Sequence, residues 1–119
     1  MTQIGISIPL ASQDVQRTTE LQFAQRSEQA GAHSVWTLDR FVWHNHEPLM
    51  SLAAISSVTT TIKLGTCVLL APLRQPALLA KQVATLDALS GGRAILGLGV
   101  GSRPDDFAAM DTPMEGRGA

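Results

Sequence analysis

The residues best suited to chemistry in this chain stand directly after apolar segments. Asp39 and Arg40 follow the apolar residues 34–38, and the glycine-rich residues 97–101 close another apolar segment. A carboxylate and a guanidinium can transfer protons or hold charge, and glycine lets the backbone approach a ligand closely. In α/β proteins, small-molecule sites are built where parallel strands end. The spacing therefore predicts a small-molecule site, with Asp39 as the polar residue on which its chemistry depends.

The glycine run Gly97-x-Gly99-x-Gly101 has a competing interpretation as a nucleotide-binding fingerprint. It lacks the G-x-G-x-x-G spacing, and we expect no helix directly after it that would meet a pyrophosphate. Two interpretations remain open for these glycines. They form either a tight exit from a strand or a platform for a flat cofactor ring.

Residues 44–47, His-Asn-His-Glu, place two imidazoles and a carboxylate close together and could ligate zinc or iron. The sequence has no second cluster to complete such a site, so we expect no bound metal. A loop between a strand and a helix also collects polar residues. We expect this loop to be a mobile lid, with Phe41 and Trp43 covering the site.

Two further features receive structural interpretations. Cys67 has no visible base beside it, so we expect a small buried hydrophobe rather than a nucleophile. Asp105 and Asp106 resemble a carboxylate pair, but adjacent residues at a helix start point apart. We therefore interpret them as first-turn charges that favour the helix dipole.

Four short apolar segments that read as strands carry these residues, and they begin about 30 residues apart, as in βα units. They are residues 4–8, 34–38, 63–70 and 94–98. Helical patterns lie between them: one over about 15–30, one that begins with Pro48, and one from Pro76 to Ser90 that ends at Gly91. This alternation predicts a parallel sheet with right-handed crossovers. Periodicity leaves two closures open, an open sheet with helices on both faces and half of a (β/α)8 barrel.

The composition excludes several classes of protein. With 119 residues, 45% hydrophobic and 16% charged, the chain fits one globular domain. A net charge of −1 gives no basic surface for nucleic acid and no polybasic membrane anchor. No signal peptide is recognisable, and no apolar run approaches the ~18 residues needed to span a bilayer. The single cysteine suits a reducing compartment, so we expect a cytoplasmic protein without nucleic-acid or membrane partners.

Several separate blocks, in order along the chain, resemble the luciferase-like monooxygenase family. Each block alone is a weak signal, and their common order makes the resemblance specific. The blocks are residues 31–39, 61–68, 71–76, 84–101, 104–107 and 116–118.

The resemblance implies an α/β fold, the first half of a TIM (β/α)8 barrel with four parallel strands and three to four helices. Residues 1–119 would be the N-terminal portion of such a domain, apparently truncated. It also implies a non-prolyl cis peptide between Cys67 and Val68. A reduced flavin ring would lie over the strand ends, and the positions implied for cofactor binding are Cys67, Val68, Gly99, Gly101 and Ser102.

The catalytic positions implied by the resemblance are Asp39 and Arg40. Many members carry Asp-His at this point, with the histidine in an acid–base or substrate-facing role. This chain carries arginine instead, which could hold an anionic group or stay solvated. The family's phosphate-binding loops belong to the later half of the barrel.

The resemblance implies a flavin-dependent oxidoreductase or monooxygenase acting on a small organic substrate. FMN is the preferred cofactor, with a deazaflavin coenzyme as the alternative. A non-catalytic half-barrel is the second hypothesis, in which open sheet edges pair in a homodimer that binds flavin without turnover. A third is that the sequence is a fragment of a longer enzyme.

Overall fold

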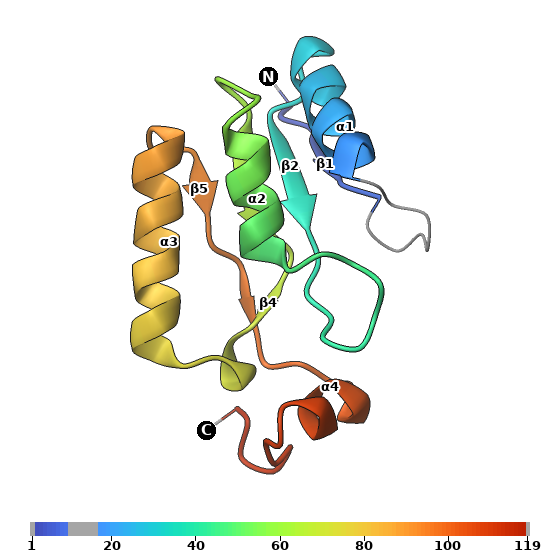
Figure 1. The fold of residues 1–119 in the computed structure, drawn as a ribbon, viewed down its shortest axis with the longest axis vertical. Helices are drawn as coiled ribbons and strands as arrows, with labels where there is room; N and C mark the ends of the chain where they lie inside the picture. Colours follow the sequence, from blue (N-terminus) through green and yellow to red (C-terminus); the bar gives the residue numbers. More distant parts are fainter. Residues whose placement is uncertain (1, 10–16, 119) are drawn as a thin grey trace.

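The computed structural model describes residues 2–9 and 17–118. In this part of the chain, four strands form one parallel sheet in the order β1–β2–β3–β5 (Figure 1). They are β1 (Gly5–Ser7), β2 (Ser34–Thr37), β3 (Lys63–Thr66) and β5 (Ala94–Ile95). A second parallel pair, β4 (Leu69–Leu70) and β6 (Leu98–Gly99), continues the paths of β3 and β5.

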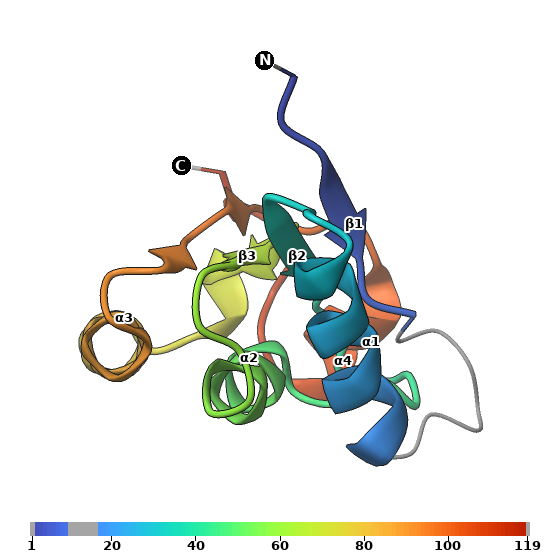
Figure 2. The same cartoon turned by 90° about the horizontal axis from the view of Figure 1, so that it is seen from above.

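Three long helices cover one face of this sheet (Figure 2). They are α1 (Arg17–Gln29), α2 (Pro48–Ser56) and α3 (Pro76–Ser90), and two short helical segments, η1 (Ala71–Leu73) and α4 (Pro104–Ala109), lie near the strand ends. None of the helices in the described ranges is both long and apolar enough to cross a membrane.

The sequence signals for helix ends are confirmed. Pro48 and Pro76 stand in the first turns, and the preceding Glu47 and Gln75 side chains accept backbone N–H groups there. α3 ends at Gly91, whose φ of 70° lies in the left-handed region. The expected start of the first helix near residue 15 lies outside the described residues.

The hydrophobic core fills the space between the sheet and the helices. Val35 and Leu64 are paired across β2 and β3, and both are fully buried together with Leu52 and Ile55 of α2. Each such side chain contributes about 1.5–3 kcal/mol on burial. On the other face, Trp36 lies across Gly5 and Gly65, where any Cβ atom would collide with its ring.

The arrangement of layers distinguishes between the two closures that periodicity leaves open. A doubly wound open sheet has helices on both faces and a reversal of strand order. Here the strands follow chain order without reversal, and the long helices of the described residues share one face. This is the arrangement of part of a (β/α)8 barrel.

Two strand predictions are wrong in detail, because each expected strand is broken in two. The expected strand over 63–70 is interrupted between Thr66 and Leu69, and the one over 94–98 ends at Ile95 and resumes at Leu98. At the break, the Thr66 hydroxyl donates to the carbonyl of Gly97 at 2.9 Å and accepts its N–H at 3.0 Å. A side chain thus replaces the backbone ladder at this point, which an apolar pattern cannot reveal.

Candidate active site

A pocket of about 390 Å³ opens where β4 and β6 end, and we call it the mouth pocket. It brings together five of the seven residues predicted for the site: Arg40, Val68, Gly99, Gly101 and Ser102. Leu70, Val100, Arg103 and Asp106 complete its lining. Asp39 and Cys67, the other two, do not line it.

The floor of the mouth pocket is apolar. Val68 and Val100 are 40% and 52% exposed, which is unusual for valine, and Leu70 lies beside them. The Val68 side chain fills the space of a Cβ at residue 99. At residue 101 a Cβ would lie 3.0 Å from the Phe107 ring, and the φ of 74° there favours glycine. Packing and backbone conformation therefore explain both glycines without a ligand.

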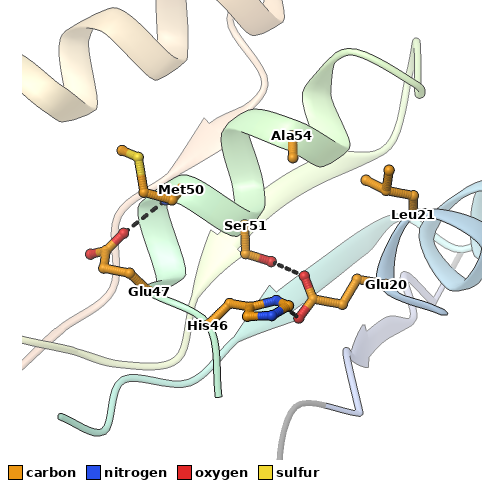
Figure 3. A pocket seen from close by; sticks show the side chains of 7 residues that line it. All are labelled: Glu20, Leu21, His46, Glu47, Met50, Ser51 and Ala54. Atoms are coloured by element: carbon orange, nitrogen blue, oxygen red, sulfur yellow. Dashed lines mark hydrogen bonds and ion pairs between the residues drawn. The ribbon is translucent and has the colours of Figure 1, made fainter. Parts of the chain in front are cut away.

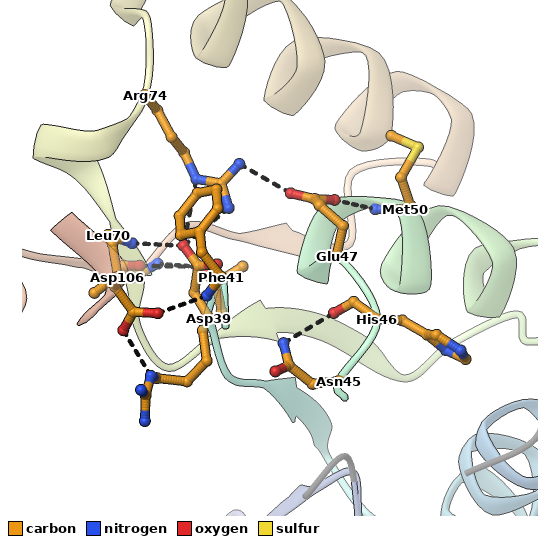
Figure 4. Close-up of polar contacts among 12 residues, drawn as sticks. Asp39, Phe41, Asn45, His46, Glu47, Met50, Leu70, Arg74 and Asp106 are labelled. Atoms are coloured by element: carbon orange, nitrogen blue, oxygen red, sulfur yellow. Dashed lines mark hydrogen bonds and ion pairs between the residues drawn. The ribbon is translucent and has the colours of Figure 1, made fainter. Parts of the chain in front are cut away.

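Asp39 is the centre of a buried ionic network (Figure 4). Its Oδ2 accepts the backbone N–H of Leu70 at 2.8 Å and the Nη2–H of Arg74 at 2.9 Å. Arg74 also donates to Glu47 at 2.9 Å, and Glu47 caps the start of α2 through the N–H of Met50. The network fixes the end of β2 to β4 and α2. A catalytic role for Asp39 stays a prediction.

Arg40 is bound by two carboxylates rather than solvated. Its Nε donates to Asp106 at 2.6 Å and its Nη2 donates to Asp105 at 2.8 Å. Asp106 is only 1% exposed and also accepts the N–H of Phe41 at 2.7 Å. The guanidinium carbon lies 4.6 Å from the centre of the Trp43 ring, a cation–π contact.

The expectation that Asp105 and Asp106 point apart is wrong. Both stand in the first turn of α4, as predicted, yet both bond to Arg40. The physical reason is the size of the guanidinium, whose two edges reach both carboxylates from the loop that follows β2. A pairing across 65 residues leaves no local signal in the sequence.

The loop between β2 and α2 is partly anchored. Phe41 does not stand free over the mouth but packs against Leu70, Leu73 and Phe107, with Arg74 over its ring at 5.2 Å. Trp43 is 48% exposed and contacts Arg40 through its ring. A lid movement of this loop stays a prediction.

The peptide bond between Cys67 and Val68 is cis, as the resemblance implies. The expectation that Cys67 is buried is wrong, because its side chain is exposed. Cys67 follows Thr66, the last residue of β3, and lies in the break before β4.

A second pocket, of about 340 Å³, lies between α1 and α2 (Figure 3). Its buried Glu20 accepts the Ser51 hydroxyl at 2.7 Å and lies 2.8 Å from Nδ1 of His46. His46 and Glu47 thus contact different partners. In residues 2–9 and 17–118, no group of three or more metal-ligating side chains could hold an ion.

Sequence reasoning missed Glu20, Arg74 and the full role of Asp106. Each acts through a partner more than 25 residues away. Arg74 and Asp106 stand in blocks that carry the family resemblance, which is the signal that could have found them, whereas Glu20 stands in none.

Comparisons with known proteins agree with this geometry. The family model described as luciferase-like monooxygenase matches residues 2–119. The F420-dependent hydroxymycolic acid dehydrogenase of Mycobacterium tuberculosis is 35% identical over 115 residues, covering 91% of this chain and 32% of the relative.

Two solved structures share the fold. The coenzyme F420-dependent tetrahydromethanopterin reductase of Methanopyrus kandleri gives a TM-score of 0.79 at 30% identity, covering 93% of this chain and 30% of that one. The oxygenating constituent of 3,6-diketocamphane monooxygenase from Pseudomonas putida, in complex with FMN, gives 0.83 at 24% identity, covering 92% and 32%. The chain thus spans about a third of the length of these proteins.

Proposed function

Because the chain belongs to the luciferase-like monooxygenase family, we propose that it forms the cofactor-facing N-terminal part of an oxidoreductase. The cofactor would be a reduced flavin or deazaflavin, and the substrate a small organic molecule. The observation that carries the proposal is the mouth pocket, which gathers Arg40, Val68, Gly99, Gly101 and Ser102 at the strand ends.

The residues of the mouth pocket fit a flat heteroaromatic ring. Val68 and Val100 expose apolar surface at its floor, and a ring would remove that surface from water. Ser102 and Arg103 also line the pocket and would supply polar contacts to such a ring. When bound, such a ring supplies hydride transfer, or oxygen chemistry in the case of FMN. The protein's residues would position it and exclude water.

We favour a deazaflavin of the F420 type over FMN. The M. tuberculosis relative and the M. kandleri reductase, 35% and 30% identical to this chain, are both named as F420-dependent. FMN is the second candidate, because an FMN-bound monooxygenase shares the fold, although at 24% identity. This order reverses the preference that the sequence alone suggested.

We assign different roles to the two predicted catalytic residues. Arg40 lines the mouth pocket and would contact the bound molecules directly. Asp39 would act as a positioning residue, because its Oδ2 holds the backbone of Leu70 and the guanidinium of Arg74.

We propose that further strands complete the barrel. In the described residues, the outer edges of β1 and β5 have no strand partner. Unpaired strand edges favour pairing with another chain segment. Either the same polypeptide or a second copy in a homodimer would supply these strands, and the cytoplasm is the compartment we propose for the assembly.

The test is an anaerobic titration of the chain with reduced F420 and, separately, with reduced FMN. Fluorescence reports cofactor binding, and sedimentation gives the oligomeric state of the chain. We expect F420 to bind more tightly than FMN.

Val68→Asp should weaken binding about tenfold or more, because it places a charge in the apolar floor. Leu89→Asp, on the exposed end of α3, is the matched control and should bind as the unaltered chain does. A folded chain that binds neither cofactor would contradict the proposal, and tighter binding of FMN would reverse the choice of cofactor.

A further inference from the structure

The charges around the mouth pocket are already balanced. Arg40 and Arg103 line it, and Arg40 is paired with Asp105 and Asp106 at 2.8 Å and 2.6 Å. Two positive and two negative side chains therefore cancel. Arg103 is exposed, so water and salt screen its charge.

Arg40 still has a hydrogen-bond donor to offer. Nε and Nη2 are used by the two carboxylates, whereas Nη1 has no acceptor among the described residues. Nη1 is also absent from the buried polar atoms that lack a partner in this part of the chain, so it has access to solvent, and Arg40 itself lines the mouth pocket. The side chain as a whole is 12% exposed. Its position is fixed by both carboxylates and by the Trp43 ring.

An anionic ligand at Nη1 would gain little from this arrangement. It would approach a guanidinium whose charge two carboxylates already neutralise, and it would stand near both negative charges. A neutral acceptor such as a carbonyl oxygen takes the same hydrogen bond without that repulsion.

We propose that Arg40 makes the mouth pocket selective for neutral, carbonyl-bearing organic molecules over carboxylates and phosphates. The proposal rests on the proposed function, because it names the substrate class of the same site. It also replaces the expectation from sequence that Arg40 either holds an anionic group or stays solvated.

The first experiment compares two probes of similar size, cyclohexanone and cyclohexanecarboxylate, at neutral pH and low salt. Binding is followed by nitrogen–proton correlation spectra that include the arginine Nε–H signals. We expect cyclohexanone to shift the Arg40 signal and to bind about tenfold more tightly than the carboxylate. Equal or tighter binding of the carboxylate would overturn the proposal, and so would the absence of ketone binding.

The second experiment changes one charge. Asp105 is 53% exposed, so Asp105→Asn should leave the fold intact while it removes one of the two charges that neutralise Arg40. We expect the carboxylate probe to bind about threefold to tenfold more tightly to this variant, with ketone binding little changed. Glu115→Gln makes the same change at an exposed residue that does not line the pocket, and it should change neither affinity. If Asp105→Asn does not bind the carboxylate probe more tightly than the unaltered chain does, the argument from charge is wrong.

The cofactor titration separates this proposal from the proposed function. If the chain binds reduced F420 but prefers the carboxylate probe, the proposed function stands and the proposed selectivity is wrong. If the chain prefers the ketone probe but binds neither cofactor, the proposed selectivity stands and the proposed function is wrong.

Discussion

The side chain of Val68 occupies the space that a Cβ atom would need at residue 99. Val68 lies in the break between β3 and β4, and Gly99 ends β6. Gly99 lies in β6, which pairs with β4 directly after Val68. The contact between the valine side chain and the glycine therefore shapes the floor of the mouth pocket.

Gly99→Ala should therefore disturb both the pocket and the fold. The added methyl group pushes the Val68 side chain toward the pocket, and such overpacking costs about 1–3 kcal/mol of unfolding free energy. We expect cofactor affinity to fall by about tenfold, measured by the anaerobic titration, together with this loss of stability in urea. Gly118→Ala is the control, since no atom lies within 4 Å of its Cβ position. Unchanged cofactor affinity in Gly99→Ala would show that Val68 does not contact the ligand.

Asp39→Asn tests the role of Asp39 as a positioning residue. The amide keeps an acceptor for the Leu70 N–H but loses the charge that pairs with Arg74, whose side chain is 11% exposed. Leaving a buried guanidinium with Glu47 as its remaining carboxylate should lower the free energy of unfolding by about 2–3 kcal/mol. Urea denaturation measures the change. Glu47→Gln, at the more exposed end of the network, should cost less, and equal losses for both variants would argue against Asp39 as the centre.

The parts of the fold that the sequence predicts are those set by neighbours in the chain. Pro48, Pro76 and Gly91 mark helix ends through local backbone geometry, and the structure has the ends at these residues. The apolar segments also locate the parallel strands. The family resemblance, rather than this pattern, implied one site for Val68, Gly99 and Arg40, and the structure brings the three residues together in the mouth pocket.

The parts that the sequence does not predict depend on side chains far apart in the chain. Asp106 reads locally as a helix-start charge, and only the fold brings Arg40 to it. The sequence shows no base beside Cys67 and so predicts a small buried side chain, whereas the fold leaves Cys67 exposed in the break after β3. Composition and periodicity contain no information on either contact.

Arg93→Lys should destabilise the fold at the end opposite the mouth. Arg93 is 7% exposed and donates to the Ser56 carbonyl at 2.9 Å, the Thr59 hydroxyl at 2.9 Å and the Ser90 carbonyl at 2.6 Å. Lysine cannot reach these acceptors together, because its ammonium is a point charge rather than a planar fork. We expect a loss of about 2–4 kcal/mol in urea denaturation. Arg26→Lys, at an exposed position on α1, should change stability by less than about 0.5 kcal/mol. Equal stabilities for the two variants would contradict the role of Arg93.

Glu28 should make the stability of the fold depend on pH in the acid range. Its carboxylate accepts the backbone N–H groups of Thr60, Thr61 and Ile62 at 2.6–3.2 Å and so holds the turn before β3 against α1. Burial opposes the charge, but these hydrogen bonds outweigh it and lower the pKa of Glu28 from 4.5 to about 2. Because the folded pKa is lower than the usual value, the charged group stabilises the fold fully above pH 4.5 and loses that effect as the pH falls toward 2.

Glu28→Gln should therefore be less stable than the unaltered chain near neutral pH, by about 1–2 kcal/mol once solvent screening is allowed for. The difference should shrink between pH 4.5 and pH 2, where the glutamate takes up a proton and becomes as neutral as the amide. Urea denaturation at a series of pH values measures both chains. Glu115→Gln, an exposed carboxylate, is the control and should show no such window. A Glu28→Gln difference that stays constant through this range would mean that the backbone N–H groups of Thr60, Thr61 and Ile62 do not depend on the carboxylate charge.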